Sequence, residues 1–589
     1  MRNPMELSAP ASGLSCNAHS QWFYLNYLIQ VFSLLCVVWF SAMSGAAGQA
    51  SSSARDRTPP KDPSEVSGTV VELAGGQPLS KARIRLHGID DPAAMILLVS
   101  DGDGHFRARA VSPGRYRLTV SRAGFVPQEY GQKDPGSPGA IMTLQPGKKI
   151  EGLVFRLIRC GVISGRVLDE DGEPLSSVIV DASQLRYVDG KRNLSTARRA
   201  ETNDLGEYRL FGLRPGRYIV SAVYPRSSRF ADEANDYGSE VEGQSYAKIY
   251  YPGTTSATDS VAIDVGPGQE VTALQLPMPK VQVFKVKGNV YSGATQRPED
   301  GANVLLMPRT RGEQWQFLEQ QVSVTPPNAA FEIPEVLPGS YILIGFSFRE
   351  GKFFSTRVPV EVGRGDVERL KLVLTSGRDV SGQIAWDGQP RVEEAQLLVT
   401  AEPTDGVFGT GWHAKVAQDN SFLLKGLPEG VYKLSISGQS PDCYIKQAHY
   451  GKSDVIKDGL NLTPEESPEL GITISSRGSR LDGTVTDEYE LPVAGARVVL
   501  VPEFTHRSES YLYKWQTTDQ YGRFQIRGIA PGGYKVYGWD YVESGAWEDP
   551  DFLKPFEQFG QTIMFQEQDQ KTVKLLVIKN KKVAVEGKE

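Results

Sequence analysis

Few residues in this chain carry reactive chemistry of their own. The 589 residues include only four cysteines and six histidines. Cys16 and Cys36 lie within the first 50 residues, and Cys160 and Cys443 are far apart in the sequence. Cysteines this few and this scattered exclude a disulfide framework as the source of stability.

Positive charge is not in excess either. The chain has 64 lysines and arginines against 70 aspartates and glutamates, which gives a formal net charge of −6. Binding to a phosphate backbone needs clustered lysine and arginine. The sequence therefore predicts no nucleic-acid partner.

Motifs of nucleotide-binding and hydrolytic enzymes are missing as well. The sequence contains no G-x-S-x-G, no G-x-x-x-x-G-K-[ST] and no H-E-x-x-H, which mark nucleophile elbows, phosphate-binding loops and zinc helices. We expect a protein that is not an enzyme and that needs no cofactor.

One long apolar run is present, at the N-terminus. Trp22 to Met43 is nearly all apolar and is followed by small residues ending at Gly48-Gln49-Ala50. This pattern predicts a secretory leader over residues 1–50, followed by a linker over 51–63. The alternative is a single membrane anchor, and the membrane is a partner only if the segment stays uncleaved. Either way, the rest is secreted or extracytoplasmic, in a periplasm or at the cell surface.

The remainder of the chain repeats itself five times. Each repeat opens with a glycine between apolar residues and later carries a phrase such as GLRPGRY, from Gly212 to Tyr218. The openings recur roughly every 100 residues, the size of one small sandwich domain. The opening glycines are Gly68, Gly165, Gly288, Gly382 and Gly483.

Alternating strands fill each repeat. Ala82, Ile84 and Leu86 show the period of two that buries one face of a strand. Short alternating strands between frequent turns favour an all-β fold. We predict a tandem array of five transthyretin-like or immunoglobulin-like β-sandwiches, followed by a tail over 580–589. The predicted domains cover 64–158, 159–279, 280–375, 376–476 and 477–579.

The repeated phrase has a structural interpretation. Pro215-Gly216 turns the chain, and the tyrosine that follows buries its ring and returns its hydroxyl to nearby backbone, as in a tyrosine corner. The five predicted corner residues are Tyr116, Tyr218, Tyr341, Tyr432 and Tyr534.

These features together resemble a known family. The opening glycine, a D-x-x-G-x-[FY] turn, the L-x-P-G-x-Y phrase and a closing strand are similar to carboxypeptidase regulatory-like domains, a transthyretin-like group related to the B-type repeats of collagen adhesins. The third repeat lacks the Asp and Gly of the turn, and the fourth has the longer Pro428-Glu429-Gly430. The resemblance implies domains that fold alone and serve as stalks, spacers or appended modules. It also implies a fold shared with starch-binding modules.

Two local motifs invite metal chemistry. His506 and Glu509 match half of a carboxypeptidase zinc site, but zinc takes three protein ligands and no histidine follows His506. Asp101 to Phe106 resembles the start of a calcium loop but lacks the carboxylate at the loop end. We predict no metal site and a hairpin turn at Asp101.

Aromatic residues gather in the loops before the last strands. Flat rings beside carboxylates suit the apolar faces and hydroxyls of sugars, whereas the structural alternative is that the rings fill the core or pin the loop. The candidate ligand platform consists of Tyr250, Tyr251, Trp539, Tyr541, Trp547, Phe552 and Phe556.

The sequence as a whole favours a non-catalytic extracytoplasmic binding and spacer protein that mediates surface interaction or adhesion. Its expected partner is a surface glycan or protein. One alternative is carbohydrate binding, chiefly through the fifth repeat. A more distant alternative is a regulatory subunit of a separate peptidase.

Overall fold

The computed structural model describes most of the chain after its N-terminal segment. The described residues are 62–91, 93–132, 136–188, 190–225, 243–309, 320–349, 352–389, 397–404, 411–463 and 468–580. The chain divides into two compact units, Met1–Pro60 and Lys61–Glu589, and the described residues all belong to the second. The predicted leader, residues 1–50, lies outside the described residues, as do 51–61 of the linker and 581–589 of the tail.

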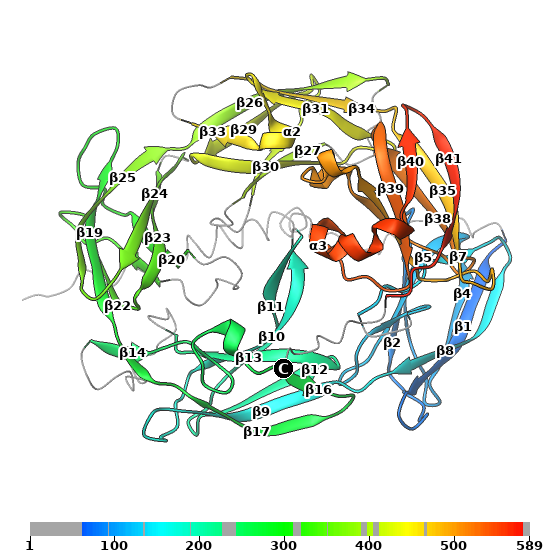
Figure 1. Cartoon of the computed structure of the whole chain (residues 1–589), viewed down its shortest axis with the longest axis horizontal. Helices are drawn as coiled ribbons and strands as arrows, with labels where there is room; N and C mark the ends of the chain where they lie inside the picture. The colour runs from blue at the N-terminus through cyan, green and yellow to red at the C-terminus, as the bar shows by residue number, and fades with distance from the viewer. Residues whose placement is uncertain are drawn as a thin grey trace, which may run out of the picture. The chain divides into compact units, whose positions relative to one another are not determined.

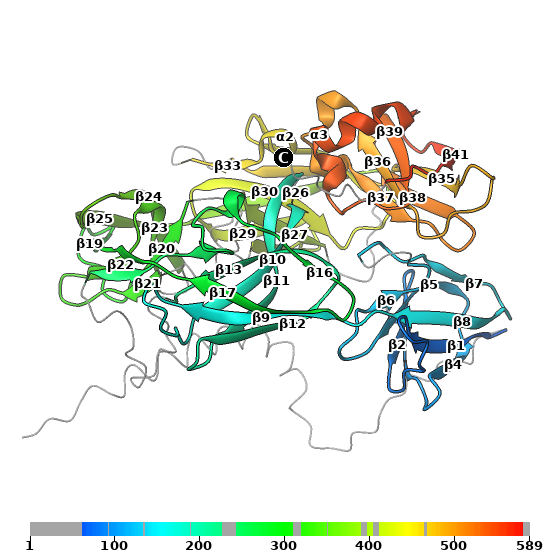
Figure 2. The same cartoon turned by 60° about the horizontal axis from the view of Figure 1, so that its bottom comes forward.

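Every repeat contains one sheet built around its opening strand. That strand lies between an antiparallel neighbour, which leads into the repeated phrase, and a parallel neighbour, which closes the repeat. In spatial order the sheets are β4 (His105–Val111), β1 (Ser64–Glu72) and β8 (Lys149–Leu157); β12 (Glu207–Leu213), β9 (Gly161–Leu168) and β17 (Glu270–Pro277); β22 (Ala330–Val336), β19 (Phe284–Ser292) and β25 (Val367–Ser376); β29 (Ser421–Leu427), β26 (Arg378–Asp387) and β34 (Leu470–Ser475); β38 (Arg523–Ile529), β35 (Ser479–Thr486) and β41 (Gln570–Leu576). Figure 2 shows β9 beside β12 and β17.

A second, antiparallel sheet faces the first in each repeat (Figure 1). Its strands are β3 (Met95–Val99), β2 (Arg83–Gly88), β5 (Gly114–Ser121), β6 (Gln128–Glu129) and β7 (Met142–Leu144); β11 (Lys191–Glu201), β10 (Ile179–Val188), β13 (Gly216–Val223), β15 (Ile249–Tyr250) and β16 (Ile263–Val265); β21 (Gln320–Ser323), β20 (Asn303–Pro308), β23 (Gly339–Arg349) and β24 (Lys352–Val362); β28 (Trp412–Lys415), β27 (Leu398–Pro403), β30 (Gly430–Ser437) and β33 (Leu460–Leu462); β37 (Lys514–Thr517), β36 (Arg497–Pro502), β39 (Gly532–Trp539) and β40 (Gln561–Phe565). In the third repeat β24 also pairs with β25, which joins the two sheets into one of seven strands.

The remaining elements are short. β14 (Gln244–Tyr246) pairs with β18 (Lys280–Gln282), and β31 (Tyr444–Tyr450) and β32 (Ser453–Asp454) extend the opening sheet of the fourth repeat. The described helical segments are α2 (Val455–Asp458), α3 (Pro550–Leu553), η2 (Ala257–Asp259), η3 (Phe504–His506), η4 (Ser510–Leu512), η5 (Ala546–Glu548) and η6 (Lys554–Phe559). None of the helices described between residues 62 and 580 has the length and apolar character needed to cross a bilayer.

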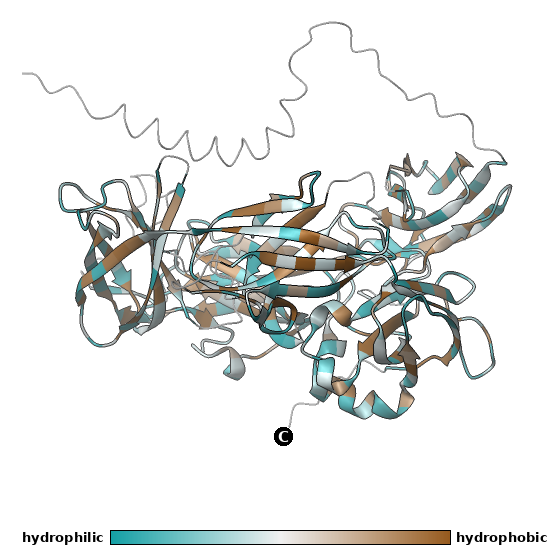
Figure 3. Cartoon of the chain, turned by 90° about the horizontal axis from the view of Figure 1, so that it is seen from above, coloured by the Kyte–Doolittle hydropathy of each residue, from teal (hydrophilic) through white to brown (hydrophobic). Residues whose placement is uncertain are grey.

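A separate hydrophobic core lies inside each repeat. Buried apolar residues cluster within 66–157, 163–278, 286–374, 380–474 and 481–575. The cores form because alternate residues of each strand face inward, as in β2, where Ile84 and Leu86 are buried between exposed neighbours. Figure 3 shows hydrophobic and hydrophilic bands alternating along the strands. The predicted fold class, an all-β array of sandwiches, is confirmed.

The opening glycine has a packing role that recurs in all five repeats. It pairs across the sheet with the aromatic residue that follows the turn, as Gly483 does with Phe524. A Cβ on Gly483 would lie 2.5 Å from Cζ of Phe524 and 2.6 Å from the Val573 carbonyl oxygen. Only glycine therefore leaves room for the ring to lie over the opening strand. The other pairs are Gly68–Phe106, Gly165–Tyr208, Gly288–Phe331 and Gly382–Phe422.

Candidate functional site

The five predicted corner tyrosines share one geometry. Each ring is buried, and each hydroxyl donates to the backbone carbonyl four residues earlier. The bonds are Tyr116–Ser112 (2.8 Å), Tyr218–Arg214 (2.7 Å), Tyr341–Leu337 (2.9 Å), Tyr432–Pro428 (2.7 Å) and Tyr534–Ala530 (3.0 Å). The ring thus fills the core, while its hydroxyl hydrogen-bonds a backbone carbonyl of the loop that precedes the strand.

The calcium-like turn at Asp101 is closed by hydrogen bonds from its own backbone amides to the Asp101 side chain. The Asp101 carboxylate accepts from the amides of Asp103 at 3.1 Å and His105 at 2.8 Å. Asn203 and Asp519 accept from the equivalent amides of their own turns. A side-chain oxygen that holds a tight turn in this way has an Asx-turn role.

The His506–Glu509 pair is engaged with itself. His506 Nδ1 lies 2.7 Å from Glu509 Oε1, and the Tyr511 hydroxyl donates to Glu509 Oε2 at 2.8 Å. Among residues 62–580, apart from the gaps given above, no group of three His, Cys, Asp or Glu side chains is arranged to hold a metal ion.

Two of the candidate platform rings lie inside the fifth repeat. Trp539 is 0% exposed and Trp547 is 2% exposed. Trp539 stacks on Tyr537 with ring centroids 4.9 Å apart and 13° between the planes. A sugar stacks on an accessible ring face. Neither tryptophan offers such a face in this structure, because both rings are buried. They instead belong to a second hydrophobic cluster on the outer face of the β36–β39 sheet.

The segment that covers this outer face supplies the other rings of the fifth repeat. Phe552 and Phe556 are half-buried and pack on Trp539, with centroid distances of 6.5 Å and 5.8 Å. Tyr541 is also half-buried, and its amide donates to the Asp540 carboxylate at 2.7 Å. Side chains of η5, α3 and η6 thus cover the outer face of the sheet.

The platform candidates of the second repeat pin a loop. Tyr250 is buried within β15, and Lys248 Nζ lies 5.0 Å from its ring centroid. Tyr251 is half-buried against the core of the same repeat and precedes a cis peptide bond to Pro252. These contacts match the structural alternative for that loop.

An exposed tryptophan that sequence reasoning missed lies beside the second cluster. Trp515 is 48% exposed, and Cζ of Arg497 lies 4.2 Å from its ring centroid. The same guanidinium lies 5.9 Å from the Trp547 ring. Burial, and then the nearby Arg117, lowers the pKa of Arg497 to about 10. Strand alternation does not mark Trp515 as exposed, because Thr517, two positions later on the same face of β37, is buried.

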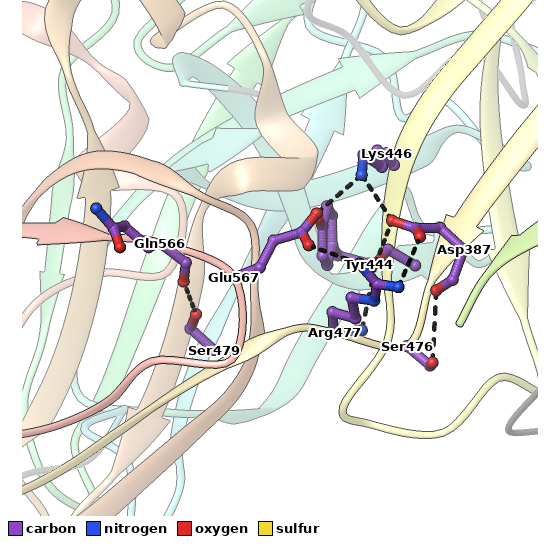
Figure 4. Close-up of polar contacts among 9 residues, drawn as sticks. Asp387, Tyr444, Lys446, Ser476, Arg477, Ser479, Gln566 and Glu567 are labelled. Carbon is purple, nitrogen blue, oxygen red and sulfur yellow. Dashed lines mark hydrogen bonds and ion pairs between the residues drawn. The ribbon is translucent and has the colours of Figure 1, made fainter. Parts of the chain in front are cut away.

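A polar junction connects the fourth and fifth repeats. Lys446 Nζ lies 2.6 Å from Asp387 Oδ2 and 2.8 Å from Glu567 Oε1, and Arg477 bridges the same two carboxylates at 3.6 and 3.4 Å. Tyr444 also donates to Glu567 at 3.2 Å. Figure 4 shows Lys446 between Asp387 and Glu567. Hydrogen bonding to Lys446 lowers the pKa of both carboxyls.

The fifth repeat also contacts repeats that are distant in the sequence. Thr143 of the first repeat donates its amide to Gln520 at 2.9 Å and accepts from Gln520 Nε2 at 2.8 Å. Tyr187, in β10 of the second repeat, packs its ring 6.1 Å from that of Phe552. The fifth repeat therefore contacts the first, second and fourth repeats through side chains.

A family match covers the first repeat. Residues 65–156 match the family described as carboxypeptidase regulatory-like domain. The predicted resemblance is confirmed: the chain is a repeat protein of β-sandwiches whose residues 65–156 are similar to a carboxypeptidase regulatory-like domain. No curated protein matches the chain.

Solved structures with some likeness include two streptococcal pilins and a protein of Bacillus anthracis. The minor pilin GBS52 of Streptococcus agalactiae has 13% identity and a TM-score of 0.22, covering 37% of this chain and 96% of the pilin. A streptococcal ancillary pilin has 14% identity and a TM-score of 0.21, covering 53% and 98%. The TIE protein of Bacillus anthracis has 11% identity and a TM-score of 0.14, covering 72% and 75%. At TM-scores this low, the likeness says nothing about what this chain binds.

Proposed function

We propose that this chain is a non-catalytic, extracytoplasmic binding and spacer protein whose repeats mediate surface interaction or adhesion. The supporting observation is that the features repeated five times, namely the opening glycine, its aromatic partner and the corner tyrosine, all have packing partners inside their own repeat. Repeated residues that serve folding leave ligand contact to the residues that differ between repeats. We also propose that each repeat folds by itself within its predicted bounds.

The location is the first part to test. The extracytoplasmic assignment rests on the apolar segment from Trp22 to Met43. Protease treatment of intact cells, with immunodetection of the chain, is expected to digest it while a cytoplasmic marker stays whole. A chain that survives until the cells are lysed would contradict the assignment.

Carbohydrate binding through the fifth repeat is the second candidate. The observation that favours it is Trp515, which exposes 48% of its surface and is held in place by Arg497. A glycan array with the full chain is expected to show selective binding that Trp515→Ala removes. Phe504→Ala is the matched control, because Phe504 is 78% exposed in the same repeat. Binding that survives Trp515→Ala, or no binding at all, would reject this candidate.

A pull-down from a native surface extract tests whether the chain binds a surface partner. A surface glycan or protein that is retained by the wild-type chain supports the binding role. The same experiment tests the peptidase alternative. If the proteins that the chain pulls down hydrolyse peptides, and a chelator abolishes this activity, the chain is better described as a regulatory subunit. Hydrolysis by the purified chain alone would contradict the non-catalytic assignment.

A further inference from the structure

A cavity of about 380 Å³ lies between the fourth and fifth repeats. Its volume falls near the lower end of the range for small-molecule sites, about 300–1,000 Å³. Four half-buried aliphatic side chains contribute apolar wall: Leu434, Ile436, Ile445 and Leu512. The wall also includes Lys514 and Gln439, from different repeats.

Lys514 lines this cavity without an ion-pair partner among the described residues. It is the first residue of β37, and within the described part of the chain its ammonium has neither an ion pair nor a hydrogen bond. Burial lowers the pKa of Lys514. Lys514 is half-buried, so its unpaired ammonium is partly removed from water, which costs free energy.

Gln439 adds a second unsatisfied group. Its side-chain oxygen is buried and has no hydrogen-bond partner among the described residues. The oxygen and nitrogen of an amide are interchangeable by a flip, which would present two N–H donors at the same place. The charged neighbours Lys433 and Glu548, which also line the cavity, have other interactions.

We propose that this cavity binds a small monocarboxylate with an apolar body. The carboxylate pairs with the Lys514 ammonium and accepts from the flipped amide of Gln439. The apolar body lies against Leu434 and Ile436 on one side and Leu512 on the other. One negative charge is expected because Lys514 supplies one uncompensated positive charge, and the aliphatic wall disfavours a fully hydrated ion such as sulfate.

The test uses two probes of the same shape. Isothermal titration of the full chain with hexanoate and with hexanamide compares a charged with a neutral head group. Hexanoate is expected to bind at least tenfold more tightly than hexanamide. Equal affinities, or no binding of hexanoate up to its solubility, would overturn the proposal.

Two lysine variants make the assignment specific. Lys514→Met is expected to weaken hexanoate binding at least tenfold, whereas Lys574→Met should bind as the wild type does, because Lys574 pairs with Glu490 on the surface. Without ligand, Lys514→Met should raise the Tm of the fifth repeat, since it removes an unpaired charge from a half-buried position. Hexanoate should raise the Tm of the wild type and not that of Lys514→Met. A lowered Tm in Lys514→Met, or retained hexanoate binding, would show that the lysine is structural and overturn the site.

Discussion

The Lys446 ammonium lies 2.8 Å from a carboxylate oxygen of Glu567, a residue of the next repeat, and 121 positions away in the sequence. Residues 476–478, between β34 and β35, form the linker that joins the two repeats; it passes beside this pair and carries Arg477, itself 3.4 Å from Glu567. One carboxylate therefore connects the body of the fourth repeat, the linker and the fifth repeat.

Removing that charge should loosen the linker. Glu567→Gln keeps the shape of the side chain but weakens its bonds to Lys446 and Arg477. We expect trypsin to cleave after Arg477 faster in this variant than in the wild type at low salt. High salt should narrow the difference, because these groups are partly exposed and their attraction is screened. Cleavage at the wild-type rate under all conditions would mean that the ion pairs do not hold the junction.

The same junction should weaken in acid. The pKa values of Asp387 and Glu567 are both lowered in the folded chain by hydrogen bonding to Lys446. A carboxyl with a lowered pKa gives stability that is present above its unfolded value, about 4 for these residues, and is lost as the pH falls through the folded value. Amide exchange of residues 476–480, corrected for intrinsic rates, is expected to be slow at pH 6 and faster below pH ~4. Protection that is unchanged down to pH ~3 would contradict this.

The tyrosines of the second repeat offer a matched pair. The Tyr218 hydroxyl donates to Arg214 at 2.7 Å, whereas the Tyr208 hydroxyl is buried without a partner among the described residues. Tyr218→Phe should lower the free energy of unfolding of that repeat by about 1 kcal/mol. Tyr208→Phe should raise it by up to about 1 kcal/mol, because a desolvated hydroxyl is removed. Calorimetry of both variants is the measurement, and equal destabilisation would contradict the corner interpretation.

Two equivalent glycines show whether the fourth and fifth repeats are in contact at their junction. Gly528 and Gly426 have φ values of +67° and +65°, but a Cβ on Gly528 would lie 2.7 Å from the Cys443 carbonyl oxygen, and one on Gly426 would meet nothing within 4 Å. Gly426→Ala should cost about 1–2 kcal/mol of backbone strain. Gly528→Ala should cost a further ~1–3 kcal/mol, since the fourth repeat must move. Urea unfolding that gives the same loss for both would show that the repeats do not touch there.

Trp547 and Trp515 separate the core from the surface of the fifth repeat. Their ring centroids are 6.4 Å apart, yet Trp547 is 2% exposed and Trp515 is 48% exposed. Trp547→Ala should cost its repeat about 3–5 kcal/mol, and Trp515→Ala less than about 1 kcal/mol. The thermal transition of the fifth repeat measures both. A small loss for Trp547→Ala would show that the aromatic cluster is not a second core.

The parts of the fold that the sequence predicted are those whose signals lie within one repeat. Gly165 and Tyr208 pair across two strands of the same sheet, and Tyr218 bonds to a residue only four positions earlier. Local spacing therefore carries the information. By contrast, Thr143 and Gln520 are 377 positions apart, and nothing in either neighbourhood marks the other as a partner.

Strand β36 of the fifth repeat shows where strand alternation fails to predict burial. Alternation predicts that Val498 and Leu500 face the core and that Val499 and Val501 face solvent, but all four are buried. The cause is the η5–α3–η6 cover, which packs on the outer face. A continuous apolar run such as RVVLVP is typical of a strand buried on both sides, and that signal was present in the sequence.

The most direct test of the account is amide exchange of the full chain carrying Tyr432→Ala. If every repeat has its own core and its own corner, exchange should accelerate across residues 376–476 while 64–158 and 280–375 keep their wild-type rates. Equal acceleration in all five repeats would show a single cooperative unit and contradict the account.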